Sequence, residues 1–324
     1  MSKAAELAAL IGSQSSLSNR NLIINGAMQV AQRGTSFTGI TDQYTLDRWT
    51  SSSAGGVSLN VSQQTATSSD NAHFASKHFA RYQRNAVLSG FVHKVENLQQ
   101  FNNKTFTLSF WAKSSDAGTN VVLTTYTVND GSSFNSYVTQ TYVTNPTLSS
   151  TWQKYEMRLT FQDMYSYGYS GSHHLRLQFF DGANAATFDI AEVQLEVGEQ
   201  ATPFEHRSFG DELARCQRYY YQTTYSGSGD TTLLSGTVAS AALAAQCGGS
   251  FPVTMRSAPT AGYNGSITAY DGSQNPAITS LSANYSSTTN ASVNTAVASG
   301  LTLGRAVQIL SNSSDDYMTF DAEL

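Results

Sequence analysis

The stretch Trp152–Phe161 reads WQKYEMRLTF, and its side chains alternate between apolar and polar with a period of two. Four apolar residues fall on one face and three charged residues on the other: Tyr155, Met157, Leu159 and Phe161 against Lys154, Glu156 and Arg158. Successive side chains of a β-strand point to opposite faces, so this pattern predicts a strand with one buried and one solvated face. Strands of this kind belong to antiparallel sheets packed as a sandwich.

Other stretches repeat the pattern, namely TFTLSFWAKSS (105–115), HLRLQFFDG (174–182) and FDIAEVQLEVG (188–198). In the last, we expect Ala191, Val193, Leu195 and Val197 on the apolar face, opposite Glu192, Gln194 and Glu196. Strands do not alternate with helices along the chain, which argues against a doubly wound fold. The pattern therefore predicts an all-β protein, with an N-terminal β-sandwich, a smaller C-terminal one and two short helices.

The composition agrees with a β-rich chain and narrows the class of partner. Charged residues make up 13% of the 324 residues and aromatic residues 11%, and the net charge is −5. Nucleic-acid-binding proteins concentrate Lys and Arg on one face, so we expect no nucleic-acid partner. Glu6 interrupts a short apolar run, and no stretch approaches the roughly 20 apolar residues of a membrane span, so we expect neither a signal peptide nor membrane insertion.

We divide the chain into four parts: 1–20, a helix and linker; 21–207, the first sandwich; 208–222, an interdomain helix or junction; and 223–324, the second sandwich. Leu7, Leu10 and Ile11 fall at i, i+3 and i+4 in the first part and predict a short amphipathic helix. A free helix of this length is marginal in water. We therefore expect these residues to dock on their own domain, a second copy or another protein.

The junction TPFEHRSFGDELARCQRYYYQ (202–222) is unusually rich in charge, which is compatible with either an active site or a joint between two bodies. Asp211 and Glu212 suit the first turn of a helix, and Arg215 follows Asp211 by four residues. Sandwich strands are predicted on both sides. These features favour a joint.

The catalytic patterns in the chain are incomplete, and we expect no enzyme. Glu192 and Glu196 share a strand face but would lie roughly 13 Å apart, whereas glycosidase pairs need about 5 to 9.5 Å. A cross-strand pair of Glu156 with Glu192 stays open. GYSGS (168–172) lacks the final glycine of a nucleophile elbow, and the neighbours His173 and His174 would face opposite sides of a strand.

A tyrosine loop is the strongest binding candidate in the sequence. MYSYGYSGSHH (164–174) places Tyr165, Tyr167, Tyr169 and His173 in a Gly/Ser-rich connection between two predicted strands. Exposed tyrosines offer apolar area with a polar tip, which suits sugar rings or partner surfaces. The alternative is that the tyrosines form an edge strand or pack on a second copy.

Residues 21–200 resemble the jelly-roll carbohydrate-binding modules of glycan-active enzymes. The resemblance lies in NLIINGAMQV (21–30), DRW (47–49) and the strands quoted above. It implies a structural calcium held by an acid near the first strand and one in the last strand. Gln29 stands at the first of these positions, and Ala191 and Glu192 stand at an acid pair in the last strand, so one charge of the pattern is missing at each end. Gln29 and Glu192 are the candidate ligands of this incomplete site. No other cofactor is expected.

A second resemblance, to bacteriophage tail, fibre and neck proteins, covers almost the whole chain. It rests on NRNLIINGAMQVAQRGTS, YTLDRW, AEVQLEVGEQATPFEHRSFGDELARCQRYYYQ, FPVTMRSAPT and FDAEL in this order. It implies a virion structural protein with a jelly-roll domain and a second β-sandwich, assembled as a homotrimer. The protein would be made in the host bacterial cytoplasm, contact other virion proteins through its N-terminus and bind host-surface glycan.

Two rival functions remain open at this point. The first is a purely structural or adaptor protein of the virion that binds no receptor. The second is a glycan-degrading tailspike, for which the sequence offers neither a catalytic pair nor a repeat of the β-helix type.

Overall fold

The structure is a computed structural model that describes residues 19–53, 59–84, 89–115, 123–128, 134–135, 138–142, 147–163, 174–182, 185–225, 227, 230–241 and 244–324. The chain divides into two compact units, Met1–Glu212 and Leu213–Leu324. This division falls inside the predicted junction 208–222. The predicted N-terminal helix, with Leu7, Leu10 and Ile11, lies outside the described residues, and so does the tyrosine loop.

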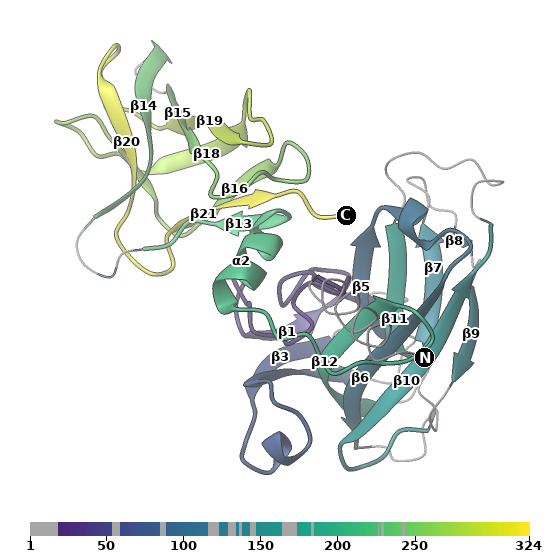
Figure 1. Ribbon diagram of the computed structural model, residues 1–324. Helices are drawn as coiled ribbons and strands as arrows, with labels where there is room; N and C mark the ends of the chain where they lie inside the picture. Colours follow the sequence, from purple (N-terminus) through teal and green to yellow (C-terminus); the bar gives the residue numbers. More distant parts are fainter. Residues whose placement is uncertain are drawn as a thin grey trace, which may run out of the picture. The chain divides into compact units, whose positions relative to one another are not determined.

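The first unit is a two-layered antiparallel sandwich, and the prediction of an all-β fold is confirmed (Figure 1). One sheet has seven strands, in the order β1 (Ser36–Ile40), β3 (Leu59–Thr65), β4 (His78–Arg84), β12 (Ala186–Val197), β6 (Thr105–Ser114), β10 (Gln153–Phe161) and β9 (Val138–Tyr142). The other has five, in the order β2 (Trp49–Ser53), β5 (Ser89–Glu96), β11 (His174–Gly182), β7 (Leu123–Val128) and β8 (Phe134–Asn135). Short 3-10 turns lie at η1 (Asp70–Ala72) and η2 (Leu98–Phe101).

The apolar face of β10 lies in the core between these sheets, as its alternation predicts. Met157 pairs with Leu108 of β6, and Leu108 pairs in turn with Leu195 of β12, so the three side chains form one row across the sheet. All three are 1% exposed or less. Burying a side chain of this size contributes about 1.5–3 kcal/mol, and repeating such rows is what holds the sandwich together.

Strand β12 departs from simple alternation at Glu192. This residue has a φ of 50°, and the register with β6 shifts between Ala191 and Gln194. A β-bulge of this kind inserts an extra residue and reverses the faces beyond it. Val193 lies in the main core as predicted, but Ala191 packs into a separate cluster and Val197 is 66% exposed. Placing Ala191 on the core face was therefore wrong, whereas Val197 stands on the same face as Val193 and Leu195, opposite Phe106 of β6, at the exposed end of the strand.

The second unit is also a sandwich of two antiparallel sheets. One has three strands, β13 (Tyr220–Gln222), β21 (Tyr317–Asp321) and β16 (Thr260–Asn264). The other has six, in the order β17 (Thr268–Tyr270), β20 (Ala306–Ser311), β14 (Thr231–Ala241), β15 (Ala244–Ser250), β19 (Asn290–Val297) and β18 (Ile278–Ala283). Its core includes Met318 and Phe320 of the small sheet and Val293, Val307 and Ile309 of the large one.

The predicted helix of the junction is α2 (Phe209–Gln217). Asp211 donates its backbone N–H to Ser208 Oγ over 3.1 Å, so Ser208 caps the helix as a serine at this position commonly does. Asp211 and Glu212 lie in the first turn and Arg215 in the last, which complements the helix dipole.

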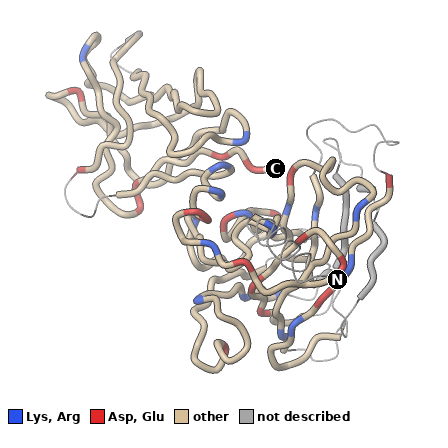
Figure 2. The backbone as a smooth tube through the Cα atoms, viewed as in Figure 1, with Lys and Arg blue, Asp and Glu red and all other residues tan. Residues whose placement is uncertain are grey.

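Charged residues are unevenly divided between the two units. Only 4 of the 18 Lys and Arg residues and 6 of the 23 Asp and Glu residues follow Glu212 in the sequence. Figure 2 shows the same contrast along the backbone. A site built from charged groups is therefore to be sought first in the first unit.

Candidate functional site

Part of the outer face of the seven-stranded sheet is covered by the segment 66–77. Phe74 of this segment packs edge to face on Trp152, with ring centroids 4.8 Å apart, and Trp152 packs in the same way on Phe79 at 5.3 Å. Ala191, turned to this side by the bulge, completes the cluster. This area is filled by protein and is not open to a ligand.

Asp70 fixes the covering segment to the sheet. Its carboxylate accepts hydrogen bonds from the N–H of Thr67 (2.9 Å), the hydroxyl of Thr67 (2.7 Å) and Nε1 of Trp152 (2.7 Å), and it lies 3.4 Å from Lys113 Nζ. Burial alone would raise the pKa of Asp70, but the bonds from Thr67 and Trp152 and the charge of Lys113 outweigh it and hold the pKa far below its ordinary value. The carboxylate is a structural anchor.

A second part of the same face lies under residues 199–205. Gln194 and Glu196 point outward from β12 yet are 0% and 3% exposed. Glu196 accepts the N–H of Thr202 (2.9 Å) and its hydroxyl (2.6 Å), and Gln194 accepts the N–H of Glu205 (2.8 Å). Both outward side chains are thus used to hold the chain that leaves the sheet.

The segment 19–26, called the strap below, runs along the edge of β12 beyond its bulge. Leu22 N–H donates to the carbonyl of Leu195 over 2.9 Å, and Val193 N–H donates to the carbonyl of Gly26 over 3.0 Å. A Cβ at Gly26 would lie 2.1 Å from the carbonyl oxygen of Val193, so only glycine fits there. This approach gives a physical reason for the NG in NLIING.

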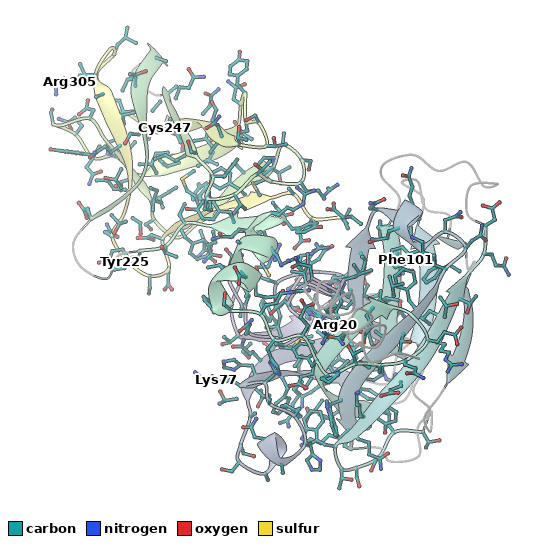
Figure 3. All side chains as sticks on the ribbon, in the orientation of Figure 1. Arg20, Lys77, Phe101, Tyr225, Cys247 and Arg305 are labelled. Carbon is teal, nitrogen blue, oxygen red and sulfur yellow. The ribbon has the colours of Figure 1, made fainter. Side chains whose placement is uncertain are left out.

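The charges of the junction tie the strap to the rest of the first unit. Arg207 donates to the carbonyl oxygens of Asn21 and Ile23 and lies 3.4 Å from carboxylate oxygens of Glu205 and Glu212. The Arg207 side chain is 6% exposed. Arg20, labelled in Figure 3, adds a contact of 3.6 Å to Glu196. Within the first unit, this charge-rich stretch forms structural contacts.

Gln29 and Glu192, the predicted calcium ligands, contact two neighbouring residues of the junction, Arg207 and His206. Gln29 Nε2 donates to the carbonyl of Arg207 over 3.4 Å, and Glu192 Oε1 lies 3.7 Å from His206 Nε2. The same Oε1 accepts the N–H of Ala75 (2.8 Å) and the N–H and hydroxyl of Ser76 (2.9 and 3.0 Å). Three donors at one oxygen do not fit a calcium ligand, because a cation prefers oxygens free of such hydrogens. Among the described residues, no group of three or more His, Cys, Asp or Glu side chains could hold a metal ion. Calcium stays a prediction.

The outer face of the five-stranded sheet carries a cavity of about 390 Å³. Leu175 and Leu177 of β11 and Val95 of β5 point into the core, so Arg176 and Lys94 point outward by alternation. The cavity is lined by these two residues, by part of β2 and by the loop before it: Asp42, Gln43, Tyr44, Thr50, Ser51, Ser52, Lys94, His174 and Arg176. We call it the Tyr44 cavity.

Tyr44 supplies the aromatic ring of the cavity and lies among cations. Lys94 Nζ is 5.3 Å from the centre of the ring, and the guanidinium carbon of Arg33 is 5.2 Å from it. Both distances are within the range of cation–π attraction. Tyr44 is half-buried and forms an isolated β-bridge with Thr50. The Tyr44 ring is therefore held in place beside the cavity.

The DRW motif (47–49), which lies in the chain between the lining residues Tyr44 and Thr50, is held by several hydrogen bonds. Asp47 accepts the backbone and side-chain N–H groups of Gln32, Arg48 donates to the carbonyl of Lys94 (2.7 Å), and Trp49 Nε1 donates to the carbonyl of Asn25 (3.1 Å). Beneath, the fully buried His93 lies against Trp49 with ring centroids 4.9 Å apart. Burial, and then the charge of Arg48, lowers the pKa of His93 well below its ordinary value.

The walls are fixed by hydroxyl and carboxylate contacts. The Ser51 hydroxyl donates to the carbonyl of Thr41, Asp42 accepts the N–H of Ser53 over 2.6 Å, and Arg176 donates to the hydroxyl of Ser52 over 2.6 Å. The loop 41–44 is thus bonded to the neighbouring strand at several points. A site of this kind is largely formed before a ligand arrives.

The sequence patterns did not indicate the Tyr44 cavity, although the predicted tyrosine loop ends next to it. Tyr165, Tyr167, Tyr169 and His173 lie outside the described residues, but His174, the next residue, lines the cavity. In the backbone register, Tyr126 of β7 stands opposite Arg176. The available signal was the cluster of polar residues at outward positions of HLRLQ and VHKVE, which is also typical of a solvated strand face.

The second unit contains a smaller cavity of about 230 Å³ at the side of its large sheet. Tyr221, Phe251 and Phe320 line it, and the remaining lining residues are small, hydroxyl-bearing or aliphatic. These rings pack on one another, with centroids 5.1 Å apart for Phe251 and Phe320. The cavity has no charged lining residue, and the Tyr44 cavity is the better candidate for polar recognition.

The chain is similar to known proteins in structure. No protein-family model matches the chain, and no curated protein matches it. The structure is similar to the enzymatically active domain of bacteriophage CBA120 tailspike protein 4, with 11% identity and a TM-score of 0.35, covering 55% of this chain and 22% of that one. The present chain thus spans less than a quarter of the length of that tailspike domain.

The structure of this chain is also similar to those of carbohydrate-binding modules. One is the xylan-binding domain of an enzyme from Paenibacillus barcinonensis, with 15% identity and a TM-score of 0.33, covering 52% of this chain and 98% of that one. Another is a family 11 module from Clostridium thermocellum, solved with a mixed-linked tetrasaccharide, with 14% identity and a TM-score of 0.29, covering 53% and 98%. In the described part of the chain, no helix has the length and apolar character needed to cross a membrane.

Proposed function

We propose that the chain is a non-enzymatic phage virion fibre protein, of the tail or neck, that binds host-surface glycan in the Tyr44 cavity. The observation that carries the binding role is the cavity itself. It is a preformed hollow on a sheet face, lined by hydroxyls, an amide, a carboxylate, an imidazole, two cations and a tyrosine ring. Sugars present hydroxyl groups around an apolar ring face, and this mixture of donors, acceptors and aromatic surface complements both.

The placement of acidic groups supports binding without catalysis. Asp70, Glu192, Glu196 and Glu205 each accept hydrogen bonds from backbone N–H groups of covering segments. In the Tyr44 cavity, Asp42 is the lining residue that carries a carboxylate. Glycoside hydrolysis uses two carboxyl groups about 5 to 9.5 Å apart. We propose the role of virion fibre and the homotrimer from the sequence resemblance to phage fibre proteins. We propose attachment through the N-terminus from the apolar stripe of Leu7, Leu10 and Ile11.

The binding role is tested by glycan-array binding and by host-cell adsorption of the isolated protein. We expect Tyr44→Ala to weaken binding by roughly two- to tenfold, because an aromatic contact of this kind contributes about 0.5–1.5 kcal/mol. The matched control is Tyr285→Ala, since Tyr285 is 83% exposed and belongs to the second unit. Melting temperatures of both variants show whether folding is intact.

Other outcomes point to the rival functions. If the protein binds no glycan and particles that lack it still adsorb, the chain is a structural adaptor. Release of reducing sugar from host polysaccharide would make it an enzyme. If Tyr167→Ala weakens adsorption and Tyr44→Ala does not, the tyrosine loop and not the cavity is the receptor site.

A further inference from the structure

Positive charge gathers around the Tyr44 cavity, although the chain as a whole has a net charge of −5. Lys94 and Arg176 line the cavity. Arg33 lies 5.2 Å from the centre of the Tyr44 ring, and Arg48 donates to the carbonyl of Lys94 over 2.7 Å. Two of the 18 basic residues therefore line the hollow, and two more contact its lining residues. Concentrating one sign of charge in a cavity raises the local concentration of ligands with the opposite sign.

Among the described lining residues, negative charge is limited to one residue at the rim. Asp42 is the acidic lining residue, and its side chain is exposed while Oδ1 accepts the N–H of Ser53 over 2.6 Å. Glu96 stands two residues beyond Lys94 on β5 and does not line the cavity. Asp47 is buried below the loop and accepts two hydrogen bonds from Gln32. The lining thus carries one carboxylate against a guanidinium and an ammonium group.

The basic groups are placed where water screens them less than at an open surface. Lys94 and Arg176 are both half-buried, and Arg48 is 1% exposed. Charges in such positions interact more strongly than exposed ones, because the effective dielectric constant is lower.

The chemistry of the basic groups suits an anionic oxygen cluster. Arg176 has a planar fork of N–H donors, one of which already bonds a hydroxyl, that of Ser52. Lys94 adds an ammonium group beside the Tyr44 ring, and Thr50 and Ser52 add hydroxyl groups to the lining. Guanidinium and ammonium groups bind carboxylate and phosphate oxygens through charge-assisted bonds, which are stronger than neutral ones.

We propose that the Tyr44 cavity selects an acidic saccharide, one that carries a carboxylate or a phosphate, over a neutral saccharide of the same shape. This inference rests on the proposed glycan-binding function and names the class of its ligand. The anionic group would lie between Arg176 and Lys94, with the sugar hydroxyls toward Thr50 and Ser52.

The test measures binding of the full chain to a panel of immobilised bacterial polysaccharides. The panel holds neutral polymers, polymers of uronic acids and polymers with phosphodiester links. Each uronic acid polymer is also presented after chemical reduction of its carboxyl groups, which removes the charge and keeps the sugar chain. We expect binding to at least one acidic polymer and a fall with added salt. Loss of binding after carboxyl reduction identifies a carboxylate as the anion, whereas binding only to phosphodiester polymers identifies phosphate.

Variants connect the binding to the cavity. Arg176→Gln and Lys94→Gln should each lower affinity for the acidic polymer by about tenfold or more, the usual effect of losing one charged hydrogen bond. Asp42→Asn keeps the oxygen that accepts Ser53 N–H and removes the opposing charge, so it should raise the affinity by about two- to fivefold. Lys154→Gln is the matched control, because it makes the same charge change on the other sheet.

The outcomes separate this inference from the function on which it rests. Equal binding to an acidic polymer and its reduced form, or binding to neutral polymers alone, with loss in Tyr44→Ala, would overturn the preference for acidic saccharides and leave glycan binding standing. No binding to any polymer would overturn both. An equal loss of affinity in Lys154→Gln would show that overall charge and not the cavity is responsible, which also overturns the inference.

Discussion

On the outer face of the seven-stranded sheet, rings and carboxylates meet other segments of the same chain. Trp152 lies under Phe74, and Asp70, Glu192 and Glu196 accept backbone N–H groups. On the outer face of the five-stranded sheet, Arg176, Lys94 and Tyr44 surround a hollow. The two faces belong to one sandwich and are built from the same alternation of residues.

The difference shows what a polar residue on a sheet face can be used for. Where a segment crosses the face, carboxylates satisfy its backbone N–H groups and become structural. Where no described segment crosses, basic and hydroxyl-bearing residues line a space that a ligand can fill. Removing contacts on the first face should therefore cost stability, and removing them on the second should cost binding.

The largest effect is expected at the covered face. Trp152→Ala removes a buried ring that packs on Phe74 and Phe79 and donates to Asp70. Truncations of this size in a core cost about 3–5 kcal/mol. Chemical denaturation of the first unit would measure the loss. If the variant loses glycan binding with no loss of stability, the division between the two faces is wrong.

A smaller loss is expected at the bulge of β12. Glu192→Ala leaves the N–H groups of Ala75 and Ser76 without their acceptor, which should cost about 1–3 kcal/mol. Glu192→Gln keeps an acceptor at the same place and should cost less, so the pair isolates the hydrogen bonds. Thermal unfolding with and without calcium extends the test, since a stabilisation by calcium that both variants abolish would support a metal site there.

The buried histidine below the cavity predicts a dependence of stability on pH. The pKa of His93 in the folded protein is far below its ordinary value of 6.5, so below about pH 6.5 the unfolded chain takes up a proton that the folded one does not. Stability should fall as the pH drops through this region, by up to about 1.4 kcal/mol per pH unit from His93. Burial, together with the charge of Lys77, also lowers the pKa of His78 and adds in the same direction.

Denaturation curves between pH 7 and pH 5 measure this slope. His93→Leu removes the titrating group, so the slope should become shallower even if the variant is less stable throughout. A slope that is unchanged in His93→Leu would contradict the assignment.

The smallest effect is expected where the seven-stranded sheet faces solvent. Lys154 lies 3.0 Å from Glu156, and both side chains are partly exposed. Ion pairs of this kind contribute little, so Lys154→Gln should change stability by no more than about 0.5 kcal/mol. A loss above 2 kcal/mol would indicate that this area is covered as well.

Alternation in the sequence was sufficient for the fold class and for much of the core. WQKYEMRLTF indicated the correct faces for β10, because an ungapped strand keeps its period. Alternation failed in β12, since the left-handed conformation of Glu192 reverses the faces and no local residue type marks it. The helix within 202–222 could be predicted because a capping serine and an acidic first turn are local signals.

The candidate site could not be predicted from the sequence, for a different reason. Tyr44, Lys94 and Arg176 come from three separate segments, which the strand order β2-β5-β11 brings together. Alternation identifies Lys94 and Arg176 as outward residues but does not identify the strands beside them. Sequence patterns therefore indicated the tyrosines that are neighbours in the chain. They did not indicate Tyr44, Lys94 and Arg176, which are neighbours only in the folded protein.

The strap also has a consequence for the order in which the first unit folds. Asn21 contacts Val193 and Leu195, and its N–H donates to Glu205, 184 residues further along the chain. During synthesis the strap is made before its partners in β12 and the junction, so its full set of contacts forms only after residues 193–207 have been made. Contacts so distant in sequence form slowly. Until the strap docks, the edge of β12 beyond its bulge is unpaired, and an exposed strand edge is where misassembly of the sandwich would begin.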